Sequence, residues 1–150
     1  MTDNQRASGI DKYSTVILIR PSGKMLLQLR DDGNGENIEY PRWWCFPGGS
    51  MEDEDGDHLD AIIREVKEEF EIDIIRSQCE FLVIYALDDK KTDHVFVCKI
   101  AETVSPRLQE GDGLRWVYFD DLRYIVLAWN QQFIIPALKE YIYEDRKNRN

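Results

Sequence analysis

Three glutamates, Glu65, Glu68 and Glu69, stand close together in the stretch REVKEE. On an α-helix, at about 100° per residue, their side chains fall on one arc of the surface. Like charges one turn apart destabilise a helix, and more so near a core edge where the dielectric is low. A hard divalent cation that prefers oxygen ligands removes this conflict. The spacing therefore favours a Mg²⁺ or Mn²⁺ site over the alternative, a solvated acidic face.

The negative charge of the chain is concentrated around these glutamates. The segment 52–73 holds eleven acids and two bases, a net charge of −9, whereas the whole chain carries −10. Such a surface is poorly suited to direct binding of a nucleic-acid polymer, because the phosphate backbone is itself anionic. It suits a cation and, through the cation, a small anionic molecule.

The composition is that of a soluble globular protein. With 150 residues, 43% of them hydrophobic, the chain is expected to form a single domain over 1–150, with 1–12 as a flexible N-terminal segment. The first dozen residues lack the apolar core of a signal peptide, and no apolar run approaches the roughly 20 residues of a membrane span. Cys45, Cys79 and Cys98 are an odd number with no close pair, which argues against a disulfide framework and favours the cytoplasm.

Strand and helix patterns alternate along the chain. The turn PSG and the polar turn DDKKTD each separate two β-rich runs and predict two hairpins. The expected strands are 13–20, 24–30, a short one in RWWCF, 81–87, 94–100 and 114–119. Helices are expected over 57–71 and 130–147, with Pro136 as a local problem in the second. These elements predict one α/β domain.

The expected helix 57–71 is amphipathic. Leu59, Ile62, Ile63, Val66 and Phe70 fall within an arc of roughly 100° and form a stripe that faces the core. The glutamates therefore lie at the edge of the buried face. They do not all point into open water.

The motif GG…REVKEEFEI, which begins in a Pro-Gly-Gly turn, resembles the signature of the Nudix hydrolases. That signature reads Gly, five residues, Glu, seven residues, Arg-Glu, an aliphatic, any residue, Glu-Glu, any residue, Gly, an aliphatic. The stretch MLLQLRDD…YPRWWCFPGG is similar to the strand and loop that precede the motif in many members. EGDGLRWVYFDDL is similar to a segment of the MutT-like nucleoside triphosphate pyrophosphohydrolases. The resemblance implies a Nudix-type α/β/α sandwich with a mixed central sheet between the two helices.

The resemblance also implies roles for individual residues. The metal ligands would be Glu65, Glu68, Glu69 and a carbonyl of Gly49 or Gly48. Arg64 would hold the preceding loop and orient a glutamate by a charge-assisted hydrogen bond. Glu65 and Glu110 are the candidates for the general base that activates water. The reaction would be Mg²⁺-dependent hydrolysis of a phosphoric anhydride bond.

The chain departs from the signature at two points. One extra residue lies between Gly49 and Arg64, so the early Glu of the signature has no clean match, and Asp55 or Asp57 is a candidate substitute. Glu71 stands where the signature has Gly. That Gly ends the helix in a left-handed conformation, which costs another residue about 1 kcal/mol.

Further candidates are assigned less directly. Trp44 and Asn130 are predicted to bind substrate, the first by stacking a base and the second by reading it. Trp43 and Trp116 are stacking candidates too. Core packing is the alternative for all three tryptophans, and a helix N-cap is the alternative for Asn130. His58 and His94 show no ligand spacing and are expected at the surface. Cys45 has no identifiable base and is expected to pack in the core.

The substrate predicted first is a nucleoside triphosphate, with an oxidised one such as 8-oxo-dGTP among the candidates, cleaved to the monophosphate and pyrophosphate. A nucleotide sugar, ADP-ribose or a dinucleotide is the runner-up. A non-catalytic nucleotide-binding module of the same fold is the alternative from a different class. The intact glutamate set favours an enzyme. The sequence leaves the oligomeric state open.

Overall fold

The computed structural model describes residues 11–109 and 111–149. Of the expected flexible segment, residues 1–10 lie outside the described residues. Within the described ranges, no helix combines the length and apolar character needed to cross a membrane.

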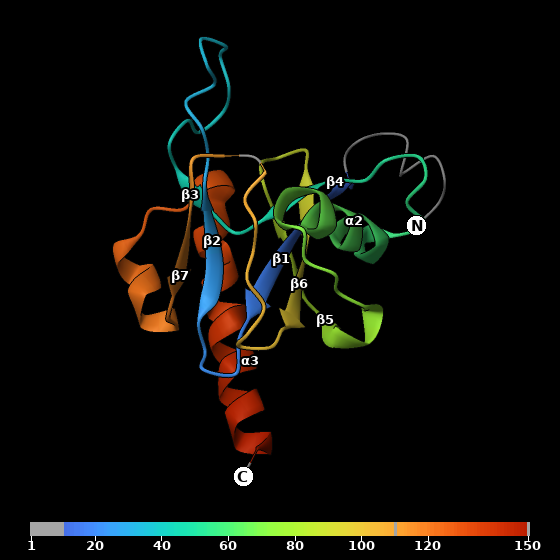
Figure 1. The fold of residues 1–150 in the computed structure, drawn as a ribbon, viewed down its shortest axis with the longest axis vertical. Helices are drawn as coiled ribbons and strands as arrows, with labels where there is room; N and C mark the ends of the chain where they lie inside the picture. Colours follow the sequence, from blue (N-terminus) through green and yellow to red (C-terminus); the bar gives the residue numbers. More distant parts are fainter. Residues whose placement is uncertain (1–10, 110, 150) are drawn as a thin grey trace.

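A mixed sheet of seven strands forms the centre of the described structure (Figure 1). The strands are β1 (Tyr13–Ile19), β2 (Met25–Leu29), β3 (Trp44–Cys45), β4 (Gly48–Ser50), β5 (Cys79–Ala86), β6 (Thr92–Lys99) and β7 (Gly113–Val117). The order is β3-β2-β1-β6-β5, with β4 paired to β1 and β7 paired to β2. β1 and β6 run parallel, and the other pairs are antiparallel. The mixed sheet and both hairpins, β1–β2 and β5–β6, are confirmed.

Two helices pack on opposite faces of this sheet, α2 (His58–Phe70) and α3 (Ile135–Asn148) (Figure 1). Successive residues of a strand point to opposite faces. Val16 and Leu18 accordingly lie in one buried cluster with the apolar stripe of α2, whereas Ile17 lies in the other with Leu138 of α3. The α/β/α sandwich is confirmed, and α2 buries the stripe expected of it.

The C-terminal helix begins later than predicted. Residues Ala128–Ile134 form a 3₁₀ segment in which Trp129 and Asn130 have positive φ values of 52° and 58°, so an α-helix cannot start at residue 130. Pro136 lies in the first turn of α3, where its missing N–H has no intrahelical partner to lose. Pro136 therefore marks the start of this helix. Two further 3₁₀ helices cover Arg76–Gln78 (η1) and Phe119–Tyr124 (η2), and Ala128–Ile134 is η3.

The two glycines of the Pro-Gly-Gly segment, expected in a turn, are part of strand β4. Gly48 pairs with Thr15 and Gly49 with Ser14 in the antiparallel contact of β4 with β1. A Cβ atom on Gly48 would lie 2.3 Å from the carbonyl oxygen of Ser14. Only glycine permits this approach, which draws the segment against the sheet next to α2.

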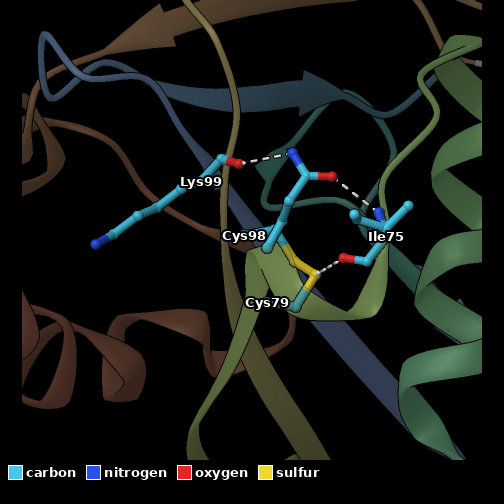
Figure 2. Close-up of a disulfide and its surroundings, with 5 residues drawn as sticks. Ile75, Cys79, Cys98 and Lys99 are labelled. Carbon is cyan, nitrogen blue, oxygen red and sulfur yellow. Dashed lines mark hydrogen bonds between the residues drawn. A yellow bond between two sulfur atoms is a disulfide. The ribbon is translucent and has the colours of Figure 1, made fainter.

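A disulfide joins Cys79 of β5 to Cys98 of β6 (Figure 2). The two residues lie opposite each other in the antiparallel ladder, with their Cα atoms 4.1 Å apart. The expectation of no disulfide is wrong, because strand pairing brings together cysteines that are distant in sequence. Cys45 is buried, and burial raises the pKa of its thiol to about 12, which agrees with the expected packing role.

Helix α2 has well-defined ends. The Asp57 carboxylate accepts a hydrogen bond from the Asp60 amide at 2.8 Å and caps the N-terminus. At the other end Glu71 adopts φ 55° and ψ 35°, the left-handed conformation anticipated at the position where the signature has glycine. Its amide donates to the Lys67 carbonyl at 3.0 Å.

The left-handed conformation of Glu71 generates a stability prediction. Glu71→Gly should raise the free energy of unfolding by about 1 kcal/mol, because glycine adopts this conformation without the Cβ clash. Urea unfolding followed by circular dichroism measures the change. Glu71→Ala is the control, since it removes the 3.8 Å ion pair with Arg107 but keeps the Cβ. A glycine variant no more stable than the alanine variant would contradict the prediction.

Candidate active site

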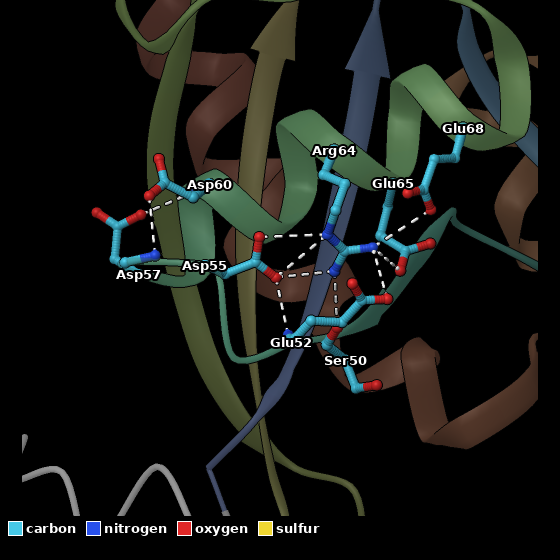
Figure 3. Close-up of polar contacts among 9 residues, drawn as sticks. Ser50, Glu52, Asp55, Asp57, Asp60, Arg64, Glu65 and Glu68 are labelled. Carbon is cyan, nitrogen blue, oxygen red and sulfur yellow. Dashed lines mark hydrogen bonds and ion pairs between the residues drawn. The ribbon is translucent and has the colours of Figure 1, made fainter.

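Arg64 is the centre of a polar network on α2 (Figure 3). One terminal nitrogen, Nη2, donates to Asp55 Oδ2 at 2.8 Å and to the Ser50 carbonyl at 3.0 Å. The other, Nη1, donates to Glu65 Oε1 at 2.9 Å and to Glu68 Oε2 at 3.3 Å. Arg64 thereby ties the loop before α2 to two of the predicted metal ligands, the orienting position proposed for it from the sequence.

The network carries more negative than positive charge. Arg64 also lies 3.3 Å from Glu52. Hydrogen bonds to Asp55, and then to Glu65, raise the pKa of Arg64 against the opposing effect of burial, so the guanidinium stays charged. The carboxylates of Glu52, Asp55, Glu65 and Glu68 around this one guanidinium leave three negative charges, and Glu69, the next residue of α2, adds a fourth. Oxygen ligands with excess charge are the donor set that fits a hard divalent cation.

Of the two aspartates considered as substitutes for the early Glu of the signature, Asp55 is the one that contacts Arg64. Its buried carboxylate binds the Arg64 guanidinium through both oxygens, at 3.2 Å and 2.8 Å. Asp57, the other candidate, faces away, where it caps α2 and pairs with Arg76 at 2.7 Å. The extra residue is therefore absorbed in the loop, and an aspartate takes the place beside the arginine.

Gly49 and Glu65 are in close contact. A Cβ atom on Gly49 would lie 2.5 Å from Glu65 Cδ, so a side chain here would displace the carboxylate. The Glu65 side chain is 18% exposed, whereas that of Glu68 is 58% exposed. The structure thus brings together Gly49, Arg64, Glu65 and Glu68 as predicted, with Glu65 at the protected centre.

Glu69 lines a cavity of about 590 Å³ that extends away from this cluster. The volume is within the range of small-molecule sites. Tyr40, Trp129 and Arg30 line another part of it, with the Arg30 guanidinium 4.3 Å from the centre of the Trp129 indole. Carboxylate, aromatic and cationic groups therefore surround one space.

Trp44 and Asn130, the two residues predicted to bind substrate, do not line this cavity among the described residues. The partly buried Trp44 packs against the core on the α3 side and bridges to Leu127, and it is not among the described residues that line the cavity. Asn130 is also absent from that lining, and its Nδ2 donates to the Leu87 carbonyl at 3.0 Å. Trp129, which the sequence reasoning passed over, lines the cavity instead. Its indole N–H donates to Glu39 at 3.0 Å.

The other tryptophans also have packing roles. Trp116 is partly buried in the core on the α2 side, with the Arg20 guanidinium 3.5 Å from its ring centre. Trp43 is 38% exposed and meets Tyr40 edge-to-face at 5.0 Å. Proximity in sequence to the Pro-Gly-Gly segment, as at Trp43 and Trp44, therefore does not identify which aromatic residues line the cavity.

Glu110 lies outside the described residues. On one side of it, the Gln109 amide donates to the Glu69 carbonyl at 2.9 Å. On the other side, Gly111 lines the cavity. The backbone that flanks position 110 thus runs beside the last of the three glutamates.

Comparison with known proteins gives a family and a fold. The family model described as the NUDIX domain matches residues 12–139. Among curated protein sequences, none matches the chain significantly. The solved structures that are similar include a MutT from work on Aliivibrio salmonicida and Vibrio cholerae, with a TM-score of 0.67 and 19% identity over 83% of this chain and 93% of that one.

Two further solved structures are similar over nearly their whole length. The NUDIX domain of Shewanella oneidensis NrtR, complexed with ADP-ribose, has a TM-score of 0.70 and 15% identity, and the match covers 95% of this chain and 99% of that one. A C. elegans Ap4A hydrolase binary complex has a TM-score of 0.68 and 18% identity, with coverage of 89% and 99%. At these identities the likeness shows the fold.

The carboxylate network generates a metal-binding prediction. Glu69→Gln should weaken Mg²⁺ or Mn²⁺ binding by about tenfold or more, since even outer-shell partners of metal ligands cost 10–100-fold. Isothermal titration calorimetry measures the affinity. Asp73→Asn is the matched control, because it removes an acid of the same segment that is paired to Lys67 and points to solvent. Unchanged affinity in Glu69→Gln would remove Glu69 from the metal site.

The Asp55–Arg64 pair generates a pH-dependent stability prediction. Hydrogen bonds from Arg64 hold the pKa of Asp55 below its ordinary value against the effect of burial. The pair therefore stabilises the fold above pH 4, roughly the ordinary aspartate pKa, and this contribution is lost as the pH falls through the lower folded pKa. Asp55→Asn should lower the free energy of unfolding by about 1–3 kcal/mol at pH 7.

Urea unfolding at pH 7 and at pH 3 tests this, and the difference between Asp55→Asn and the unmodified chain should narrow at the lower pH. The exposed Asp53 of the same loop supplies the control, since Asp53→Asn should change stability by less than about 0.5 kcal/mol at either pH. A constant difference across the pH range would show that the ion pair does not stabilise the fold.

Proposed function

We propose that this chain, which belongs to the NUDIX domain family and is a hydrolase of pyrophosphate bonds, cleaves a nucleoside triphosphate to the monophosphate and pyrophosphate. One observation carries the proposal. The carboxylate cluster held by Arg64 adjoins, through Glu69, a cavity large enough for a nucleoside.

The residues of the cluster would have different roles in hydrolysis. Mg²⁺ or Mn²⁺ held by Glu65, Glu68, Glu69 and the Gly49 carbonyl would neutralise the polyphosphate charge and lower the pKa of water. Arg64 donates a 2.9 Å hydrogen bond to the Glu65 carboxylate and restricts its rotation. Glu65 or Glu110 accepts the proton of the attacking water.

The other end of the cavity suits the nucleoside. Tyr40 and Trp129 offer aromatic surfaces on which a base can stack. Arg30 lies over the Trp129 ring and Lys91 also lines the cavity, so two cations offset part of the negative charge of the acids in the lining. These groups support a nucleoside as part of the substrate, with 8-oxo-dGTP among the candidates.

A second substrate class has specific support. The similar NUDIX domain of NrtR is a complex with ADP-ribose, and another similar structure is an Ap4A hydrolase. ADP-ribose, a nucleotide sugar or a dinucleotide is therefore the alternative substrate of the same site. A non-catalytic module is disfavoured because Glu65, Glu68 and Glu69 are all present.

We propose a small-molecule substrate for this activity, as the charge distribution favours. The cytoplasmic location predicted from the cysteines rested on the expected absence of a disulfide. The Cys79–Cys98 disulfide opposes a reducing compartment.

A substrate panel with Mg²⁺ tests the proposal. The unmodified chain should release pyrophosphate from nucleoside triphosphates, and the Glu68→Gln/Glu69→Gln double variant sets the baseline. Reaction in ¹⁸O-water places the label on the attacked phosphorus. Glu65→Gln and Glu110→Gln, assayed separately, should rank the two candidate bases, with a loss of roughly 10²–10⁴-fold for the true one. Asp73→Asn should keep the full rate.

The outcomes separate the alternatives. Release of a monophosphate from ADP-ribose or a nucleotide sugar, with triphosphate turnover at the baseline, would select the second substrate class. Nucleotide binding without turnover of either class would select the non-catalytic module.

A further inference from the structure

Two histidines and an aspartate meet at the N-terminal end of α2. His58 is the first residue of α2, His94 lies in β6 and Asp11 precedes β1. The two imidazole rings stack with their centroids 3.8 Å apart and their planes 15° from parallel. The expectation that both are surface residues is wrong, because the side chains of His58 and His94 are only 8% and 16% exposed.

The Asp11 carboxylate faces both rings. Its Oδ1 atom pairs with Nε2 of His94 and accepts a hydrogen bond from the Thr92 hydroxyl at 2.9 Å. Its Oδ2 atom lies 4.0 Å from Nε2 of His58. Each of the three residues offers one ligand atom, and these atoms lie within 4.8 Å of one another. Two nitrogens and a carboxylate oxygen thus lie near one another at one place in the fold.

We propose that Asp11, His58 and His94 form a second metal site, which binds a divalent transition-metal ion of the zinc class. Two imidazole nitrogens and a carboxylate are the donors that such ions take in proteins, whereas Mg²⁺ prefers sites of oxygen alone. The glutamate cluster and this site therefore select different ions.

The dimensions are compatible with an ion. Zinc lies about 2.0–2.2 Å from nitrogen and carboxylate ligands, so its ligand atoms are separated by up to roughly 4 Å. Closing the set requires side-chain movements on the order of 1 Å from the 4.8 Å span, together with rotation of the stacked rings, because the lone pair of each nitrogen lies in the plane of its ring. Three protein ligands leave a fourth position for water.

The chemistry of the group also suits a cation. The Asp11 carboxylate lies against both rings, so a negatively charged oxygen faces the two imidazoles. Metal binding requires imidazole ligands in their neutral form and therefore competes with protons.

The site is separate from the proposed catalytic centre. His58 and Glu65 are seven positions apart on α2, or about 10 Å along the helix axis. A metal here would link the first turn of α2 to β6 and to Asp11, two residues before β1. It would fix the N-terminal end of α2. The glutamates lie in the C-terminal half of the same helix and would stay free for Mg²⁺.

Zinc binding to the full chain tests the proposal. The Glu65→Gln/Glu68→Gln/Glu69→Gln variant removes the competing carboxylates. Equilibrium dialysis in excess Mg²⁺, followed by metal analysis, should find one Zn²⁺ per chain in it. Adding His94→Gln should weaken this binding at least tenfold, and adding Asp11→Asn instead should weaken it similarly. Adding Asp120→Asn, which neutralises a carboxylate on η2, should leave it unchanged.

A second readout follows the fold. Zn²⁺ should raise the thermal midpoint of the triple variant, and His94→Gln should abolish the rise, because an ion that binds the folded chain stabilises it by mass action. Circular dichroism establishes that each variant is folded. A folded triple variant that takes up no Zn²⁺ would overturn the proposal, as would full affinity after both His94→Gln and Asp11→Asn.

Discussion

Repulsion among carboxylates is the constraint on which the arrangement around α2 depends. Four acids, two from the loop before α2 and two from the helix, lie within 3.3 Å of the single side chain of Arg64. The guanidinium has enough donors, in a fixed planar geometry, to hold several acceptors at once. Asp55 takes the best-buried side of it, and Glu65 and Glu68 share the other. A lysine could not make this set of contacts, so the loop conformation and the carboxylate positions rest on one side chain.

The backbone must approach closely for this arrangement to exist. β1 pairs with β6 on one side along its whole length, from Tyr13 to Ile19, and with β4 over its first residues. Gly48 and Gly49 have no side chain to hold the chain away, so β4 lies against both β1 and the Glu65 carboxylate. The absence of a Cβ atom is therefore the property of these glycines that matters. They bring a backbone segment within reach of a carboxylate cluster that a larger residue would push apart.

Local sequence predicted the helix that carries the site and failed where distant segments meet. The apolar stripe and the left-handed Glu71 are properties of neighbouring residues, and α2 begins and ends within one residue of the prediction. The Cys79–Cys98 bridge depends on the register of two strands, and the His58–His94 stack depends on the packing of α2 on β6. Trp129 reaches the cavity through an irregular 3₁₀ segment. No periodicity in the sequence encodes these long-range contacts.

The electrostatics of α2 favour different chemistry at its two ends. The aligned peptide dipoles place partial negative charge at the C-terminus of a helix and partial positive charge at the N-terminus, worth about 0.3–1 kcal/mol to a nearby charge. The glutamates lie in the C-terminal half, where a hard cation held by them gains from the dipole. His58 lies at the N-terminus, where a cation is disfavoured, so ligands must supply more of the binding energy. Imidazole nitrogens bind a transition metal strongly enough to do so, and the Asp11 carboxylate adds negative charge directly beside the two rings.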